Sequence, residues 1–252
     1  MRFAASPVSQ SMTTALITTE PAAPIDEVAA TLARRHVSAV PVLDDRGSIV
    51  GVVSRSDLLH HQRLHPHAEG VRCADVMTQG PIVVAPDTSL RAAAQLMIEH
   101  HFHRLFVVDG GRLAGVITTT DLTRAVEAAR LEAPIRAFMT APVVTIRVEQ
   151  PLSLAIDRLD RAHISGLVVT ENEWPIGVFA QEEALAARAL DLATPVGDLA
   201  DPALICLPYE TSLHRAAAQC ARMGVRRIVA CHDRDFVGVV TGLDFAAAVA
   251  QA

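Results

Sequence analysis

The motif Gly115-Val116-Ile117-Thr118-Thr119-Thr120-Asp121 is the clearest guide to the fold of this chain, because its pattern recurs at regular intervals. A glycine, two aliphatic residues, a hydroxyl residue and, three positions later, an aspartate also occupy residues 51–57 and 238–244. Residues 177–183 carry a weaker version that ends on Glu183. Aliphatic residues followed by Ser or Thr are typical of a strand that ends where a helix begins. Each stretch therefore predicts one strand-to-helix junction.

Further positions repeat in the same register and make the chain a fourfold repeat. Each copy begins with a two-residue lead, and the leads lie 61 to 65 residues apart: Met12-Thr13, Met77-Thr78, Met139-Thr140 and Ala200-Asp201. An anchor residue follows the first lead residue by 24 positions in every copy: His36, His101, His163 and Gly224. Four copies in one register indicate a repeat architecture.

Copy 2 gives the clearest secondary-structure prediction. Short apolar runs predict strands over residues 82–84, 105–108 and 113–118, with the hairpin turn Asp109-Gly110-Gly111 between the last two. Apolar residues at helical spacing predict a helix over residues 90–101, and an alanine-rich helix follows over 122–129. Each copy is thus predicted to be β-α-β-β-α, an α/β (α+β) fold. One unit of about 60 residues cannot bury both helices and its sheet, so the copies are expected to pair.

A second periodicity separates odd copies from even copies. At the predicted first helical position, copies 1 and 3 carry proline and copies 2 and 4 carry serine: Pro24, Pro151, Ser89 and Ser212. Just after the anchor, odd copies are neutral and even copies are basic: Ser38-Ala39, Ser165-Gly166, His103-Arg104 and Arg226-Arg227. We infer that a pair of copies was duplicated as a unit, with a boundary near residues 130–136.

These motifs resemble the cystathionine β-synthase (CBS) domain, most clearly in Asp75-Val76-Met77-Thr78, residues 83–90 and residues 115–121. The resemblance covers nearly the whole chain as four motifs, at residues 8–60, 71–130, 135–188 and 196–250. It implies that motifs 1 and 2, and motifs 3 and 4, pair into two Bateman modules. The four-motif arrangement of the family is a flat disk, which is the shape expected here.

The resemblance also implies a function. Bateman modules commonly bind adenosine-containing ligands in clefts between motifs, so we expect a stand-alone regulatory protein with no catalytic cofactor, not an enzyme. It would sense AMP, ADP or ATP and transmit occupancy to an effector protein. The alternatives are S-adenosylmethionine, NAD(H) or a cyclic dinucleotide as ligand, or a structural scaffold that responds to no ligand. A formal net charge of −6 argues against a nucleic-acid partner, and homodimerisation is left open.

The strand-to-helix junctions carry the predicted ligand residues. A helix N-terminus favours anions through its N–H groups and its dipole, and a nearby hydroxyl can donate to a phosphate. The junction residues expected to contact phosphate are Ser54, Arg55, Thr118, Thr119 and Thr241. The resemblance implies that the aspartates accept from ribose hydroxyls: Asp57, Asp121 and Asp244. A hydroxyl residue followed by an acid three positions later is also a capping box, so helix capping is the alternative.

The basic pairs of the even copies form a second candidate site. His103-Arg104 resembles the His-Arg step that contacts phosphates in the gamma subunit of AMP-activated protein kinase, and Arg226-Arg227 occupies the same position in copy 4. The planar fork of arginine suits phosphate. Successive strand side chains point to opposite faces, so only one member of each pair is expected to face the ligand. The alternative is a set of solvated charges at the edge of a strand.

The adenine ring is expected among apolar strand residues, which suit a plain core equally well: Ile17, Val40, Pro41, Ile82, Val83, Leu204 and Ile205. Copy 3 departs from the pattern, because Ala180 has no hydroxyl and Glu182 adds a negative charge beside Glu183. The site of copy 3 is therefore expected to be empty or to bind an uncharged group.

Composition excludes several functions. All 22 basic residues are arginine, which rules out a lysine-dependent phosphate-binding loop and Schiff-base chemistry. No apolar run approaches about 18 residues, no signal peptide is recognised, and the cysteines have no CxxC spacing, so a cytoplasmic protein without a membrane partner is expected. The linker histidines lack a completing ligand at convincing spacing, so no metal site is predicted: His60, His61, His65 and His67.

Overall fold

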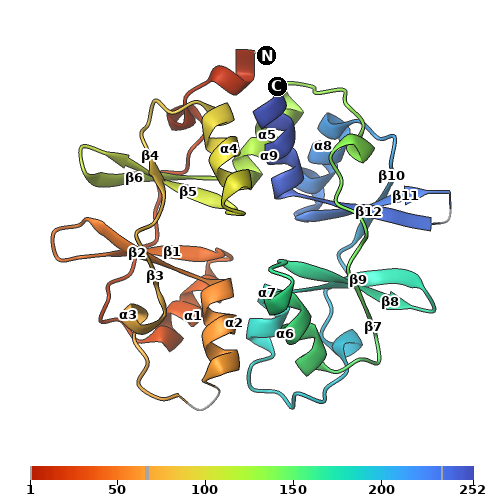
Figure 1. Ribbon diagram of the computed structural model, residues 1–252, viewed down its shortest axis with the longest axis horizontal. Helices are drawn as coiled ribbons and strands as arrows, with labels where there is room; N and C mark the ends of the chain where they lie inside the picture. Colours follow the sequence, from red (N-terminus) through yellow and green to blue (C-terminus); the bar gives the residue numbers. More distant parts are fainter. Residues whose placement is uncertain (1, 66–67, 234) are drawn as a thin grey trace. The chain divides into compact units, whose positions relative to one another are not determined.

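The computed structural model describes residues 2–65, 68–233 and 235–252, and it confirms a mixed α+β fold built from repeated elements (Figure 1). Within these residues the strands form four three-stranded sheets. Of the linker histidines, His67 lies outside the described residues.

Copies 2, 3 and 4 contain the three strands that the repeat predicts. The first strand of each copy runs parallel to the second, and the second and third strands form an antiparallel hairpin. The strands are β4 (Val83–Val84), β5 (Arg104–Asp109) and β6 (Arg112–Thr118) in copy 2, β7 (Thr145–Arg147), β8 (Gly166–Glu171) and β9 (Trp174–Ala180) in copy 3, and β10 (Ile205–Pro208), β11 (Arg227–His232) and β12 (Asp235–Thr241) in copy 4.

Copy 1 departs from this order. Its hairpin is β1 (Ala39–Leu43) and β2 (Ile49–Ser54), but the third strand of the sheet is β3 (Thr78–Gln79), which carries part of the lead of copy 2. The expected first strand is reduced to a parallel bridge between Thr19 and Val42. The next donor of that ladder would be the amide of residue 21, and Pro21 has no N–H, so the ladder ends after one residue.

Two helices follow the pattern in every copy. The first helices are α1 (Ile25–Arg34), α4 (Leu90–Glu99), α6 (Leu152–Arg161) and α8 (Leu213–Met223). The second helices are α2 (Arg55–Leu64), α5 (Thr119–Ala128), α7 (Gln181–Ala186) and α9 (Gly242–Gln251). Short turns of helix accompany them: α3 (Cys73–Val76), η1 (Arg2–Ala5), η2 (Val8–Gln10), η3 (Ile135–Ala137) and η4 (Val196–Asp198).

The helix ends explain the anchor residues of the repeat. Each anchor lies just beyond the first helix of its copy and has a positive φ, from 51° to 66°: His36, His101, His163 and Gly224. A residue in this left-handed region turns the chain out of the helix. The helix starts differ from prediction by one residue, because Pro24 and Pro151 are N-caps and do not occupy the first helical position.

The chain forms two compact units, each of which holds the bodies of two alternate copies and the leads of the other two. Unit 1 consists of Met1–Leu16, Ile82–Val143 and Leu204–Ala252, and unit 2 consists of Ile17–Pro81 and Val144–Ala203. In unit 1, α9 packs against α4 and α5, and α5 packs against α8, so copies 2 and 4 share one core (Figure 1). In unit 2, α2 of copy 1 packs against α6 and α7 of copy 3.

This division gives the odd–even alternation of the sequence a structural meaning. The two basic pairs lie in unit 1, and the serines at the same repeat positions lie in unit 2. The residues that follow the anchors are therefore basic in unit 1 and neutral in unit 2. The pairing of copies 1 with 2 and 3 with 4 into Bateman modules stays a prediction.

Each lead pairs with a strand of another copy, which we call the sister copy. Copies 1 and 2 are sisters, and so are copies 3 and 4. Thr13 bridges Val116, Thr78 pairs with Val52, Thr140 bridges Val239 and Asp201 bridges Val178, always within one unit. The repeated glycine makes room for the lead. A Cβ on Gly115 would lie 2.5 Å from the sulfur of Met12, and a Cβ on Gly51 would lie 2.6 Å from that of Met77. The Met-Thr lead of one copy and the repeated glycine of another copy thus contact each other directly, which explains why both positions recur.

Candidate functional site

The aspartates of the repeated motif cap the second helix of their copies. In copy 1, Asp57 Oδ2 accepts hydrogen bonds from the backbone N–H and the hydroxyl of Ser54, at 2.7 and 2.5 Å. Equivalent bonds of 2.6 to 2.9 Å join Asp121 to Thr118 and Asp244 to Thr241. The capping interpretation is therefore confirmed for one oxygen of each carboxylate.

In Asp57 and Asp244, the other carboxylate oxygen accepts from a second segment of the chain. Thr78 of the copy 2 lead donates to Asp57 Oδ1 at 3.0 Å, and Thr140 of the copy 3 lead donates to Asp244 Oδ1 at 3.1 Å. In copy 2, Arg124 Nη1 lies 3.0 Å from Asp121 Oδ1. Burial raises the pKa of Asp244, although the bonds from Thr241 and Thr140 act in the opposite direction.

Four basic residues of copies 2 and 4 gather in unit 1, and we call them the basic quartet: His103, Arg104, Arg226 and Arg227. Burial of the His103 ring, together with the positive charges of Arg104, Arg227 and Arg226, lowers its pKa from 6.5 to about 4. His101 has a smaller electrostatic effect, which also lowers the pKa of His103. The imidazole is therefore neutral at pH 7, and the three guanidinium groups supply the positive charge.

Two helix N-termini lie beside the basic quartet. Thr119, the first residue of α5, donates its backbone N–H to the carbonyl of His103 at 3.0 Å. Gly242, the first residue of α9, approaches Thr119 so closely that a Cβ on Gly242 would lie 2.6 Å from the Thr119 Cβ. The positive ends of two ten-residue helices thus add to the field of the quartet.

The strand register places one arginine of each pair on the sheet face that points away from the core. Arg104 pairs with Thr118, and Arg227 pairs with Thr241, so each arginine shares a face with a junction hydroxyl. The alternate residues Leu105, Ile117, Ile228 and Val240 lie in the core of unit 1. Sequence reasoning missed the apolar residues on these arginine-bearing faces: Val116, Phe106, Val229 and Val239. Strand alternation counted from the arginines would have found them.

The predicted adenine residues do not share one environment. Val40 is 1% exposed and lies in the core, and Ile205 pairs with the core residue Ile228. The plain-core alternative describes both. Pro41 and Val83 occupy the opposite face of their sheets, and Val83 is 41% exposed. The remaining three are half-buried: Ile17, Ile82 and Leu204.

Unit 2 has a different charge arrangement at the equivalent junctions. Glu183 caps α7 by accepting from the Ala180 N–H at 2.8 Å, as its aspartate counterparts do. Burial raises the pKa of Glu183, and the nearby charges of Glu182 and Asp201 raise it further. Arg55 of copy 1 is buried and donates to Glu182 Oε2 at 2.6 Å. A carboxylate therefore already faces the guanidinium group of Arg55.

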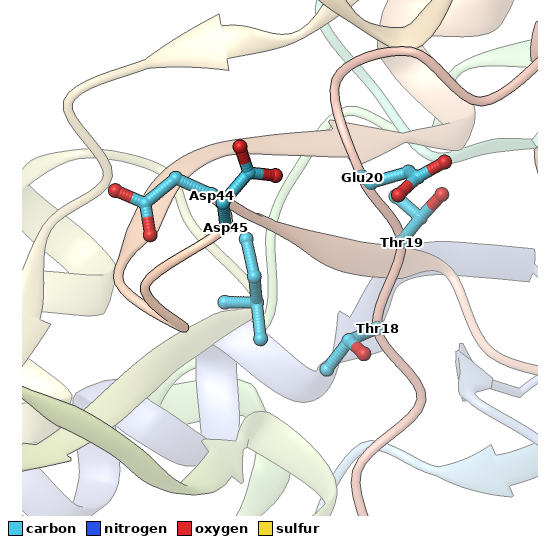
Figure 2. A pocket seen from close by; sticks show the side chains of 6 residues that line it. Thr18, Thr19, Glu20, Asp44 and Asp45 are labelled. Atoms are coloured by element: carbon cyan, nitrogen blue, oxygen red, sulfur yellow. The ribbon is translucent and has the colours of Figure 1, made fainter.

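A hollow of about 410 Å³ in unit 2 is lined by none of the predicted ligand residues. Figure 2 shows its walls, which are Thr18, Thr19, Glu20, Leu43, Asp44 and Asp45. Asp44 Oδ1 accepts from the backbone N–H groups of Arg46 and Ser48, so it closes the β1–β2 turn. Three carboxylates around one hollow repel a phosphate.

Within residues 2–65, 68–233 and 235–252, no three His, Cys, Asp or Glu side chains are grouped so as to hold a metal ion. The linker histidines have other contacts: His60 Nδ1 lies 3.2 Å from Asp160, and the rings of His61 and His65 lie 5.0 Å apart. No helix in the described part of the chain is long and apolar enough to cross a membrane.

The chain belongs to the CBS domain family. The family model matches four segments, at residues 8–63, 73–128, 135–189 and 196–251. This fourfold match agrees with the repeat read from the sequence and is consistent with two Bateman modules.

Individual relatives match parts of the chain. The chloroplastic CBS domain-containing protein CBSX2 of Arabidopsis thaliana is 32% identical over 42% of this chain and 56% of its own length. Inosine-5'-monophosphate dehydrogenase of Mycobacterium tuberculosis is 34% identical over 45% of this chain but only 21% of the enzyme. The crystal structure of protein MJ1225 of Methanocaldococcus jannaschii has a TM-score of 0.87 at 13% identity and covers 96% of this chain and 99% of its own, which shows a shared fold. The chain spans about half the length of the first curated relatives.

Proposed function

We propose that this protein is a regulatory nucleotide-binding protein in which the basic quartet of unit 1 holds the phosphate groups of an adenosine-containing ligand. AMP, ADP and ATP are the ligands that this chemistry favours. The protein carries out no catalysis in this proposal. Ligand occupancy changes its affinity for an effector protein.

One observation carries the proposal. The four basic residues come from two segments more than 120 positions apart, yet Arg104, Arg226 and Arg227 all act on the ring of His103. Positive charges gathered at one place attract an anion such as phosphate, and the lowered pKa of His103 reflects their combined field. Two helix N-termini and the junction hydroxyls Thr118 and Thr241 add donors of the kind that phosphate accepts.

The nucleoside part of the ligand is assigned by family resemblance and by the sheet faces. Asp121 and Asp244 are the ribose acceptors of unit 1, through the oxygen that capping does not use. Val116 and Val239 are half-buried on the faces that carry Arg104 and Arg227 and offer apolar surface there, whereas Phe106 and Val229 on the same faces are buried. A purine ring is stabilised by such surface at about 25 cal/mol per Å² of apolar area buried.

Calorimetric titration with adenosine, AMP, ADP and ATP tests the proposal. We expect AMP to bind more tightly than adenosine, because only AMP has a phosphate for the quartet. The double substitution Arg226→Gln and Arg227→Gln should weaken AMP binding about 10- to 100-fold and leave adenosine nearly unchanged, since a hydrogen bond to a charged group contributes about 1.5–3 kcal/mol.

Arg112→Gln is the matched control, because Arg112 begins β6 at the hairpin end and Arg104 begins β5 at the opposite end of the same strand pair. It should bind AMP like the unaltered protein. Equal affinity for adenosine and AMP, with no effect of the double substitution, would remove the quartet from the site. Failure of every adenosine compound to bind would overturn the proposed function.

Ligand binding regulates an effector only if the ligand prefers one of two states of the protein. The quartet is drawn from both copies of unit 1, so a phosphate that contacts His103 or Arg104 together with Arg226 or Arg227 would link copy 2 to copy 4. Affinity of the purified protein for a captured effector, measured with and without AMP, tests this second step.

A further inference from the structure

Arg55 is a buried cation at a position that carries no charge in the other copies. It is the first residue of α2, and its repeat counterparts are Thr119, Gln181 and Gly242. Only 5% of its side chain is exposed. A buried guanidinium group is strongly unfavourable unless an anion pairs with it, so the partner of Arg55 decides what this part of unit 2 can bind.

The partner is Glu182 of copy 3. Its Oε2 accepts from Arg55 Nη1 at 2.6 Å, and its Oε1 lies 3.5 Å from His36 Nδ1. The repeat counterparts of Glu182 are uncharged: Ser56, Thr120 and Leu243. The chain thus has its extra cation in copy 1 and its extra anion in copy 3, and the two meet within unit 2.

Glu182 accepts from only one of the terminal nitrogens of the Arg55 guanidinium group. Arg55 Nη2 is buried and has no hydrogen-bond partner among the described residues. A guanidinium group presents a planar fork of donors that matches two oxygens of one phosphate. The single contact with Glu182 leaves one arm of that fork unmatched, which is the arrangement expected when a carboxylate substitutes for a larger oxyanion.

We propose that Arg55 is an anion-binding residue for phosphate or a phosphate monoester, and that Glu182 is an internal anion that keeps this site closed. A phosphate group can bind to Arg55 only when Glu182 is displaced from it or neutralised. The inference deepens the proposed function and rests on it for its biological meaning. Unit 1 then accepts the phosphate of a ligand, while unit 2 rejects it.

Glu182→Gln is the test variant, because it keeps the side-chain shape and removes the charge that neutralises Arg55. The probe is inorganic phosphate in a chloride buffer of constant ionic strength, and the readout is the thermal midpoint. The variant should melt below the unaltered protein without phosphate. Phosphate at about one hundred times its Kd should then raise the midpoint by roughly 5–10 °C more than in the unaltered protein.

The double variant Arg55→Gln with Glu182→Gln is the matched control, because it removes both charges and should lose the added response to phosphate. All variants, and the parent with which they are compared, also carry Arg226→Gln and Arg227→Gln, so that the response of unit 1 is weakened equally in all of them. Equal phosphate responses of Glu182→Gln and its parent would overturn the inference, and so would a response that survives the loss of Arg55.

The two proposals fail separately. Tight AMP binding by the unaltered protein without a gained phosphate response in Glu182→Gln overturns only the inference. A gained response with no nucleotide binding anywhere overturns only the proposed function. Should Glu182→Gln not fold in chloride, refolding in phosphate is the readout, and Glu182→Thr provides a second variant with the residue type of copy 2. Failure of phosphate to rescue either variant contradicts the inference.

Discussion

The carboxylate at the end of each repeated motif has two oxygens with different partners. In Asp57 and Asp244, Oδ2 closes the capping box and Oδ1 accepts from a threonine of another copy's lead. Capping and ribose binding therefore do not compete for the same atom. A ribose hydroxyl would meet Oδ1, where it replaces or joins the threonine, so the ribose role stays a prediction that capping does not contradict.

His103 makes stability depend on pH. Its pKa is about 4 in the folded protein and about 6.5 in the unfolded chain. Between these values the unfolded chain binds a proton that the folded protein does not, so the free energy of unfolding falls as pH drops from about 6.5 to 4. Urea unfolding at pH 7.5 and pH 5 should show this loss, and His103→Gln should reduce it, because glutamine does not titrate. An equal loss in both proteins would contradict this prediction.

The same residue reports on the ligand. A bound phosphate offsets the charges of Arg104, Arg226 and Arg227, so the pKa of His103 should rise on binding. A fraction of the His103 imidazole rings should therefore take up a proton when the ligand binds. NMR titration of the imidazole with and without AMP measures the shift. An unchanged pKa in saturated protein would place the phosphate away from the quartet.

At the scale of elements, the contact between a lead and a glycine joins each copy to its sister. In three copies the methionine of the lead lies against the glycine, whereas in copy 3 the backbone of Asp201 takes that place, and a Cβ on Gly177 would lie 2.7 Å from its carbonyl oxygen. A methionine can change rotamer, but a bridged backbone cannot move without breaking its pairing with Val178.

We therefore expect Gly177→Ala to destabilise the protein more than Gly115→Ala. Both substitutions overpack a close contact, which typically costs about 1–3 kcal/mol. The methionine beside Gly115 can yield, so that variant should lie at the low end of the range. Urea unfolding of the two variants gives the comparison, and the reverse order would show that the methionine is held as firmly as the backbone.

At the scale of the whole molecule, the copies are distributed over two units with separate cores. The N-terminal segment belongs to the core of copies 2 and 4, because Ala4 and Val8 are fully buried there. Separate cores allow one unit to open without the other. A destabilising substitution in the N-terminal segment should therefore loosen the core of copies 2 and 4, far along the chain, and leave the body of copy 1 unchanged.

Val8→Asp and Ser9→Asp make a matched pair for this expectation, because Val8 is buried and Ser9 is exposed. Burying an unpaired carboxylate is strongly unfavourable. Hydrogen exchange should show lower protection of α4, α5 and α9 in Val8→Asp and native protection of β1 and β8 in both variants. Loss of protection in β8 would mean that the two units open together.

Much of the architecture was predictable because it depends on neighbours in the sequence. The apolar spacing of Leu90, Ala93, Ala94 and Met97 predicted a helix, and all four side chains are buried. The missing first strand of copy 1 was not predicted, since its cause is a ladder that ends at Pro21. Val40 was named for an adenine pocket because its apolar character cannot tell the two faces of a strand apart, and the structure places it in the core.

The fourfold repeat, the strand-to-helix junctions, the departure of copy 3 and the order of elements outside the first strand of copy 1 could be predicted from the sequence alone, which left capping and ligand contact open as roles of the junction acids. These features follow from local periodicity, turn residues and cap chemistry, which act over a few positions. Three features became visible only in the folded chain: the bodies of alternate copies share a unit, the charges of Arg226 and Arg227 act on His103, and Glu182 faces Arg55. Those outcomes depend on contacts between residues more than one hundred positions apart, and no local pattern encodes which charges will meet.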